Sequence, residues 1–268
     1  MRVLRGALSI FICLTVLTGA GSVHAHPLTT RNVRVIHLDA AGADAVAYIR
    51  LTLPLLVGNG VAPPSAGMPV PAAPFTLPRW ESGLPFWYAD IDAIRSNAWE
   101  LGRLVVEGHG VAVDGGTIPG RLLSVAVHPR GHVPPFDTVA QAAIAVAPVP
   151  WPNNVTEIDS GYVIVDTAVA YSVPRGVRRL TISSQLAPGA LGEAATVNLV
   201  VDHRDGDAVY YRTTGLLTEP LVIAPGPLEG AGTFVRGGID RAAGNPSKFG
   251  ITLRGIPVNS ESLCRESE

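Results

Sequence analysis

Short segments in which apolar and polar residues alternate recur along most of the chain, and this pattern constrains the fold more than any other feature. Alternation with a period of two is typical of a β-strand that buries one face. The number and spacing of the segments predict a mostly β protein with β-sandwich-like antiparallel sheets, or two sheet-based modules. The expected strands are residues 32–38, 45–53, 103–113, 122–128, 139–146, 161–171, 178–186, 196–202, 208–214 and 221–223.

Two pairs of these strands are expected to form hairpins, because their connections are rich in turn residues. The first connection is DAAGAD and the second is RDGD, whose Asp-Gly pair supplies the positive φ angles of a tight turn. The second turn also holds side chains of metal-ligand type, but they lack the spacing of a calcium-binding loop, and turn geometry alone accounts for them. These side chains are Asp202, His203, Asp205 and Asp207.

Residues 88–104 have helical periodicity instead. Apolar residues at i, i+3, i+7 and i+10 form one stripe on a helix, namely Ile91, Ile94, Ala98 and Leu101. Asp90 is expected to cap the N-terminus, and Gly102 or Gly108 to end the helix. The predicted fold is therefore mostly β with one helical insertion.

Residues 54–88 are expected to form a long Pro-rich loop, because eight prolines between positions 54 and 85 prevent a continuous central strand. The loop ends in an aromatic group made by Trp80, Phe86, Trp87 and Tyr88. If exposed, these residues would form a surface for a sugar, a membrane or a partner protein. The alternative, which the usual burial of aromatic residues favours, is that they fold back and cover the core.

The first 25 residues have the three-part layout of a secretory signal peptide. Arg2 and Arg5 precede an apolar run of 13 residues, which is short for a membrane span, and small residues lead to a cleavage site at Ala25. We expect export to the periplasm or the extracellular space; an uncleaved anchor is the alternative. The exported chain keeps a single cysteine, Cys264, and therefore has no internal disulfide.

The mature chain divides into a β-rich part, residues 26–240, and residues 241–268, which lose all periodicity and are expected to be disordered. The formal net charge of −2 argues against a nucleic-acid partner. Serine-hydrolase, zinc-protease and phosphate-loop motifs are absent from the sequence. A non-enzymatic protein is therefore expected.

His26 is the candidate metal ligand, since cleavage after Ala25 would place an α-amine and an imidazole on one residue. Both groups suit Cu²⁺ or Ni²⁺, and a second histidine would help to complete a square-planar site. The ordinary alternative is that the signal cut happens to leave a histidine. Pro27, which restricts His26, supports that alternative.

Three segments resemble the N-terminal extracytoplasmic domain of HupE/UreJ-like membrane proteins. They are AHPL at residues 25–28, a helix-to-strand segment at 97–108 that leads to Asp114-Gly115-Gly116, and GTFVRGGID at 232–240. The resemblance implies a soluble β-rich domain with a membrane or membrane-protein partner. After Asp240 the family continues with histidines in a long apolar helix, whereas this sequence continues with RAAG, so no metal-handling residue is carried over. The expectation is a truncation or frame shift before the transmembrane part, or a stand-alone soluble version.

Three functions follow from these observations. The leading hypothesis is a non-enzymatic exported domain that binds a ligand or partner. The second is a periplasmic copper- or nickel-binding protein that uses His26, and the third is a secreted enzyme that acts on glycans through the aromatic group. The sequence names no ligand, and no constellation of catalytic residues accompanies the third hypothesis.

Overall fold

The computed structural model describes residues 32–42, 44–65, 67–174, 176–192, 196–206 and 208–224, with the backbone of 234–235. The predicted signal peptide, His26 and the predicted tail lie outside these residues. The described part is mostly β, as the alternating pattern predicts. Its strands form a seven-stranded sheet, a four-stranded sheet and a separate hairpin.

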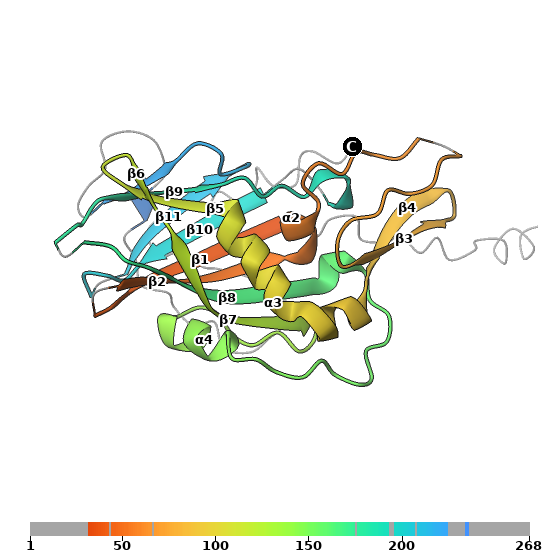
Figure 1. The fold of residues 1–268 in the computed structure, drawn as a ribbon, viewed down its shortest axis with the longest axis horizontal. Coiled ribbons are helices and arrows are strands. Elements are labelled where there is room, and N and C mark those ends of the chain that lie inside the picture. Colours follow the sequence, from red (N-terminus) through yellow and green to blue (C-terminus); the bar gives the residue numbers. More distant parts are fainter. Residues whose placement is uncertain are drawn as a thin grey trace, which may run out of the picture. The chain divides into compact units, whose positions relative to one another are not determined.

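The larger sheet has the strand order β13-β11-β10-β1-β2-β8-β7 (Figure 1). Both predicted hairpins are confirmed as the antiparallel pairs β1–β2 and β10–β11. One pair departs from the expected antiparallel arrangement: β1 and β10 run parallel, with Asn32 opposite Thr196. The strands are β1 (Asn32–Ala41), β2 (Asp44–Thr52), β7 (Gly120–Pro129), β8 (Val163–Tyr171), β10 (Thr196–Asp202), β11 (Val209–Thr214) and β13 (Phe234–Val235).

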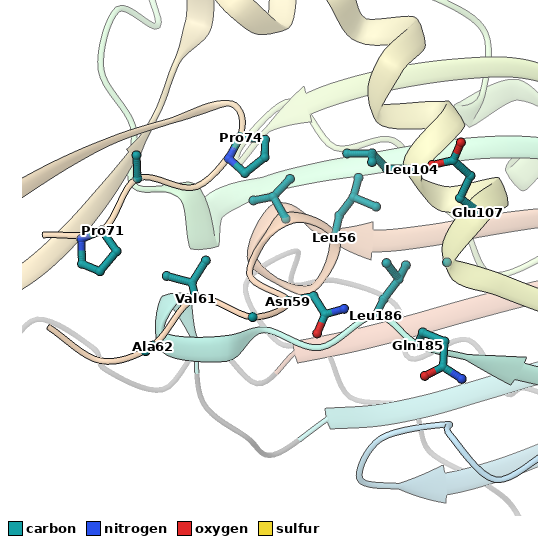
Figure 2. Close-up of a pocket in the computed structure, with 14 residues that line it drawn as sticks. Leu56, Asn59, Val61, Ala62, Pro71, Pro74, Leu104, Glu107, Gln185 and Leu186 are labelled. Carbon is teal, nitrogen blue, oxygen red and sulfur yellow. The ribbon is translucent and has the colours of Figure 1, made fainter.

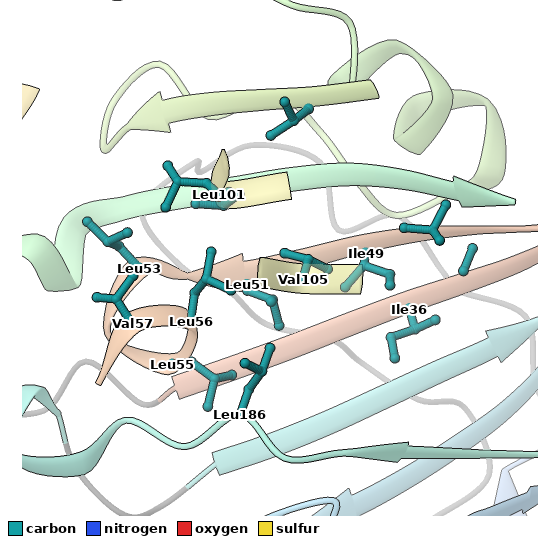
Figure 3. Close-up of a cluster of buried hydrophobic side chains, with 14 of the residues drawn as sticks. Ile36, Ile49, Leu51, Leu53, Leu55, Leu56, Val57, Leu101, Val105 and Leu186 are labelled. Carbon is teal, nitrogen blue, oxygen red and sulfur yellow. The ribbon is translucent and has the colours of Figure 1, made fainter. Parts of the chain in front are cut away.

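The second layer combines a small sheet with a long helix. The small sheet has the order β12-β9-β5-β6, and helix α3 (Ile91–Gly108) packs against β7 and β8 of the large sheet (Figure 1). One apolar core joins Ile36 and Ile49 of the large sheet to Leu101 and Val105 of α3 (Figure 3). The small sheet consists of β5 (His109–Val113), β6 (Gly116–Ile118), β9 (Leu180–Ser184) and β12 (Leu221–Ile223).

Helix α3 begins where the sequence predicts, because the Asp90 side chain accepts a hydrogen bond from the Ala93 N–H at 3.0 Å. It continues to Gly108, so the predicted strand at 103–113 is wrong for its first six residues. Val105 continues the buried stripe one turn after Leu101, and this keeps the segment helical. A Cβ on Gly108 would lie 2.3 Å from Leu186 Cδ2, and the small residue is therefore required at this end.

The predicted strand at 139–146 is also wrong, since this segment is helix α4 (Val139–Ala145). Thr138 and Gln141 form a capping box, in which each side chain accepts a hydrogen bond from the other residue's backbone N–H. Four alanines and a glutamine within the segment favour helix over strand. The fold therefore has more than one helical insertion.

Residues 54–88 are not one loop. Pro54 occupies the first turn of the short helix α2 (Leu53–Val57), where a missing N–H costs nothing. Strands β3 (Thr76–Glu81) and β4 (Leu84–Ala89) form an isolated hairpin with Ser82 and Gly83 at positive φ. The two short 3₁₀ helices are η1 (Ser160–Tyr162) and η2 (Gly189–Leu191).

Candidate functional site

The predicted aromatic group does not form one exposed surface. Phe86 and Trp87 are buried, Tyr88 is half-buried, and Trp80 is 39% exposed. Trp80 and Trp87 lie on the same face of the hairpin. Strand pairing places Trp80 opposite Pro85 and Trp87 opposite Pro78 on that face. For Phe86 and Trp87 the surface prediction is wrong, and the alternative in which the aromatic residues fold back is the better description.

The two tryptophans hold the irregular Pro-rich stretch, residues 61–74, which we call the proline strap. The Trp80 Nε1–H donates to the Met68 carbonyl and the Trp87 Nε1–H to the Pro71 carbonyl, each at 2.8 Å. These carbonyls are three residues apart in the sequence. The hairpin therefore holds the proline strap through two side-chain hydrogen bonds.

The proline strap forms one wall of a cleft of about 720 Å³ (Figure 2). The opposite walls come from the end of α2, the C-terminal end of α3 and the segment before η2. Apolar side chains dominate, with amides at Asn59 and Gln185 and a carboxylate at Glu107. The apolar lining residues with side chains are Leu56, Val57, Val61, Ala62, Pro71, Ala72, Pro74, Leu104 and Leu186.

Glu107 gives the cleft its charge. No lysine or arginine of the described residues lines the cleft, and the Glu107 carboxylate accepts a hydrogen bond from Arg103, one turn earlier on α3. Both side chains of this pair are about half exposed, so the pairing contributes little to stability. The cleft therefore presents an apolar body with one acidic group at its edge.

Backbone-to-backbone contacts join residues 58–61 to residues 188–190. A Cβ on Gly58 would lie 1.9 Å from the Pro188 carbonyl oxygen, and a Cβ on Gly189 would lie 2.0 Å from the Gly58 carbonyl oxygen. The Ala190 N–H donates to the Val61 carbonyl at 3.0 Å. Because no side chain separates the two segments, the start of the proline strap is held against η2.

Two buried polar residues lie in the core beside the cleft wall. Arg34 is fully buried, donates to the Asn198 side chain at 2.7 Å and to the Leu186 carbonyl at 3.2 Å, and its Nε has no partner among the described residues. Burial lowers the pKa of Arg34 to about 10. The His109 Nδ1 lies 2.8 Å from the Val105 carbonyl, and burial, with the nearby Arg34 charge, lowers its pKa to about 3.

A second polar cluster lies on the opposite face of the large sheet. The Arg50 guanidinium donates two hydrogen bonds to Asp166 at 2.8 and 2.7 Å, and Asp166 is fully buried. Four side chains of this face contact backbone carbonyls of residues 134–146: Arg50 with Pro134, His37 with Phe136, His128 with Ala145 and Ser124 with Val146. The cluster thus ties α4 and its preceding loop to the sheet.

The residues of the β10–β11 turn do not gather around a metal position. Arg204 binds the Asp202 carboxylate at 2.8 and 2.9 Å, and Arg178 binds Asp205 at 2.8 Å. His203 contacts His37 instead, and Asp207 lies outside the described residues. In the part of the chain that the structure describes, no group of three or more His, Cys, Asp or Glu side chains converges on a metal position.

Comparisons of the chain with protein-family models, with curated proteins and with solved structures found no match. Among the described residues, no helix is long and apolar enough to cross a membrane. The fold and the site together define a mostly β domain with an open apolar cleft. The sequence contains no signal for that cleft, because its walls come from four segments whose proximity depends on the tertiary structure.

Proposed function

We propose that the protein is a non-enzymatic exported domain that binds a small, mainly apolar molecule in the cleft beside the proline strap. The volume of the cleft carries this proposal: about 720 Å³ lies within the range of about 300–1,000 Å³ typical of small-molecule sites. Apolar walls with a few polar groups at the edge are also typical of such sites.

The charge of the cleft selects among apolar ligands. Glu107 is its one charged lining residue among those described, and the lining amides of Asn59 and Gln185 are uncharged. Arg103 already pairs with both Glu107 and Glu100 and does not line the cleft, so an anionic ligand would meet the carboxylate with no cation among the described lining residues. A neutral or cationic ligand with an N–H group would meet hydrogen-bond acceptors. The proposed ligand is therefore a neutral or positively charged apolar molecule.

Two fluorescent probes that differ by one sulfonate test this proposal. N-phenyl-1-naphthylamine is apolar, neutral and has one N–H, and 1-anilinonaphthalene-8-sulfonate is its anionic counterpart. We expect saturable binding of the neutral probe and at least about tenfold weaker binding of the sulfonate, measured by fluorescence titration. Equal or tighter binding of the sulfonate would contradict the proposed charge selection.

A matched pair of substitutions locates the binding. Ala72 lines the cleft and is exposed, so Ala72→Trp fills the cleft without disturbing the core. Ala140 is exposed on α4 and does not line the cleft, so Ala140→Trp adds the same side chain elsewhere. Loss of neutral-probe binding in Ala72→Trp alone is the expected result; unchanged binding in both variants would place the probe outside the cleft.

The export and the family relationship belong to the same proposal. They rest on the signal-peptide pattern of residues 1–25 and on the three segments that resemble the soluble domain of HupE/UreJ-like proteins. In that setting the domain would work outside the cytoplasm, and its ligand would reach the cleft from the periplasm or the extracellular space. A membrane-protein partner follows from the resemblance alone.

Copper or nickel binding at His26 is the second candidate function, favoured by the amine and imidazole that cleavage at Ala25 would leave on one residue. Mass spectrometry of the exported protein is expected to give a chain that begins with His26. Titration with Cu²⁺ and Ni²⁺ should then show binding that one extra residue before His26 weakens by at least about tenfold. Equal affinity in both chains would remove the amine chelate.

A further inference from the structure

His37 and His203 meet end to end on the face of the large sheet to which α4 and its preceding loop are tied. The His37 Nδ1 lies 3.0 Å from the His203 Nε2, the ring centres are 5.3 Å apart, and the ring planes differ by 23°. Each ring nitrogen lies at a fixed distance from its own ring centre. The difference between the centre-to-centre distance and the nitrogen-to-nitrogen distance is the largest that two imidazole rings permit. The two nitrogens therefore lie nearly on the line between the ring centres, with their lone-pair directions pointing at each other.

The surroundings fix the tautomer of His37. Its Nε2 lies 2.8 Å from the Phe136 carbonyl, which only accepts hydrogen bonds, so Nε2 carries the proton and Nδ1 is left with a lone pair. A backbone carbonyl that binds the second nitrogen is also the usual way in which proteins orient a metal-binding histidine. His37 is buried, and Phe136 packs edge-on against its ring.

We propose that His37 and His203 form a two-coordinate site for a monovalent d¹⁰ metal ion, Cu⁺ or Ag⁺. Such ions accept two ligands in a line, which is the arrangement of Nδ1 and Nε2. Zinc, nickel and divalent copper need more protein ligands, and the described residues offer no third side chain at this position. The pair therefore selects the ion by ligand number and by geometry.

Binding requires a small movement of one ring. Two metal–nitrogen bonds of about 2.0 Å need the nitrogens about 4 Å apart, or about 1 Å farther than in the hydrogen-bonded pair. His203 follows the last residue of β10 and is only partly buried, so its side chain is the one that moves. In the hydrogen-bonded pair the His203 Nε2 carries the proton that it donates to the His37 Nδ1. On binding, His203 changes to the tautomer that is protonated at Nδ1, which frees the lone pair of Nε2. The neutral pair thus binds the ion without net release of a proton.

Burial opposes a positive charge at the pair, since it lowers the pKa of His37 to about 4 and lowers that of His203, but nearby carboxylates act against this effect. The carboxylates of Asp39 and Asp202 act on His203 and that of Asp137 acts on His37, all in the direction that stabilises a cation. Arg50 acts in the opposite direction on His37, but it is already paired with Asp166. The three carboxylates therefore offset part of the cost of burying a monovalent ion at the pair.

Titration with Ag⁺ in chloride-free buffer tests the site. The exported chain should carry Cys264→Ser and His26→Ala, so that its thiol and the predicted N-terminal chelate do not compete. We expect one Ag⁺ per chain by calorimetry, with ¹⁵N NMR shifts at the His37 Nδ1 and at both ring nitrogens of His203, whose proton moves from Nε2 to Nδ1. Absence of binding, or shifts at other histidines, would overturn the proposal.

Matched variants separate the pair from general silver binding. His203→Ala should weaken binding by at least about 100-fold, whereas His132→Ala, which removes an exposed loop histidine, should leave it unchanged. The circular dichroism spectrum and melting temperature of each variant verify folding. An equimolar amount of Zn²⁺ should not displace Ag⁺; displacement by Zn²⁺, or full binding in His203→Ala, would overturn the two-coordinate assignment.

Discussion

Replacement of Asp166 by Asn is expected to lower the free energy of unfolding by about 3–5 kcal/mol, because it leaves the charge of Arg50, whose side chain is only 12% exposed, with no carboxylate partner. Asp166 is fully buried and accepts two hydrogen bonds from Arg50, and its Oδ2 lies 3.4 Å from the His128 Nε2. Urea denaturation at neutral pH, followed by circular dichroism, measures the change.

An exposed ion pair supplies the matched control. Arg178 and Asp205 also pair at 2.8 Å, but both side chains are more than half exposed, so Asp205→Asn should cost less than about 1 kcal/mol. The double variant Arg50→Met, Asp166→Leu should be more stable than Asp166→Asn, since it removes both buried charges. A loss in Asp166→Asn no larger than that in Asp205→Asn would show that the buried pair does not stabilise the fold.

Elements that depend on residues close together in the sequence could be predicted, whereas elements that depend on residues far apart in the sequence could not. The β10–β11 hairpin and the start of α3 depend on residues within a few positions of each other, an Asp-Gly turn and the Asp90 cap, and both were predicted. The parallel pairing of β1 with β10 joins residues 164 positions apart at Asn32 and Thr196, and no local pattern specifies it. Helix α4 is predicted as a strand from its alternating pattern, although Thr138 and Gln141 have the spacing of a capping box.

The candidate sites depend still more on tertiary contacts. Trp80 and Trp87 are predicted from the sequence to form a surface for a ligand or partner if exposed, whereas in the structure each indole N–H donates to a carbonyl of the proline strap, which precedes them in the sequence. Gly58 and Gly189 allow two distant backbones to touch, and no local pattern in the sequence specifies that contact. The meeting of His37 with His203 follows from the same parallel pairing of β1 and β10, which brings the two residues to one face of the sheet.

Acid is expected to destabilise the fold through His109. A histidine of the unfolded chain takes up a proton below its ordinary pKa of about 6.5, whereas burial keeps the folded His109 neutral down to a pKa of about 3. Between these values the unfolded state binds more protons, so the free energy of unfolding is undiminished above pH 6.5 and falls as the pH decreases toward 3. The contribution of this residue amounts to roughly 3 kcal/mol by pH 4.

Urea denaturation of the parent and of His109→Asn between pH 7.5 and pH 4 isolates this effect. An asparagine N–H can still donate to the Val105 carbonyl but does not titrate, so the variant should lose less stability on acidification than the parent, whatever its stability at neutral pH. His132→Asn, at an exposed position, should follow the parent throughout. Parallel curves of stability against pH for the parent and His109→Asn would contradict this prediction. They would mean that the His109 imidazole takes up a proton in the folded protein as readily as in the unfolded chain. In that case its burial beside Arg34 would not be maintained in solution.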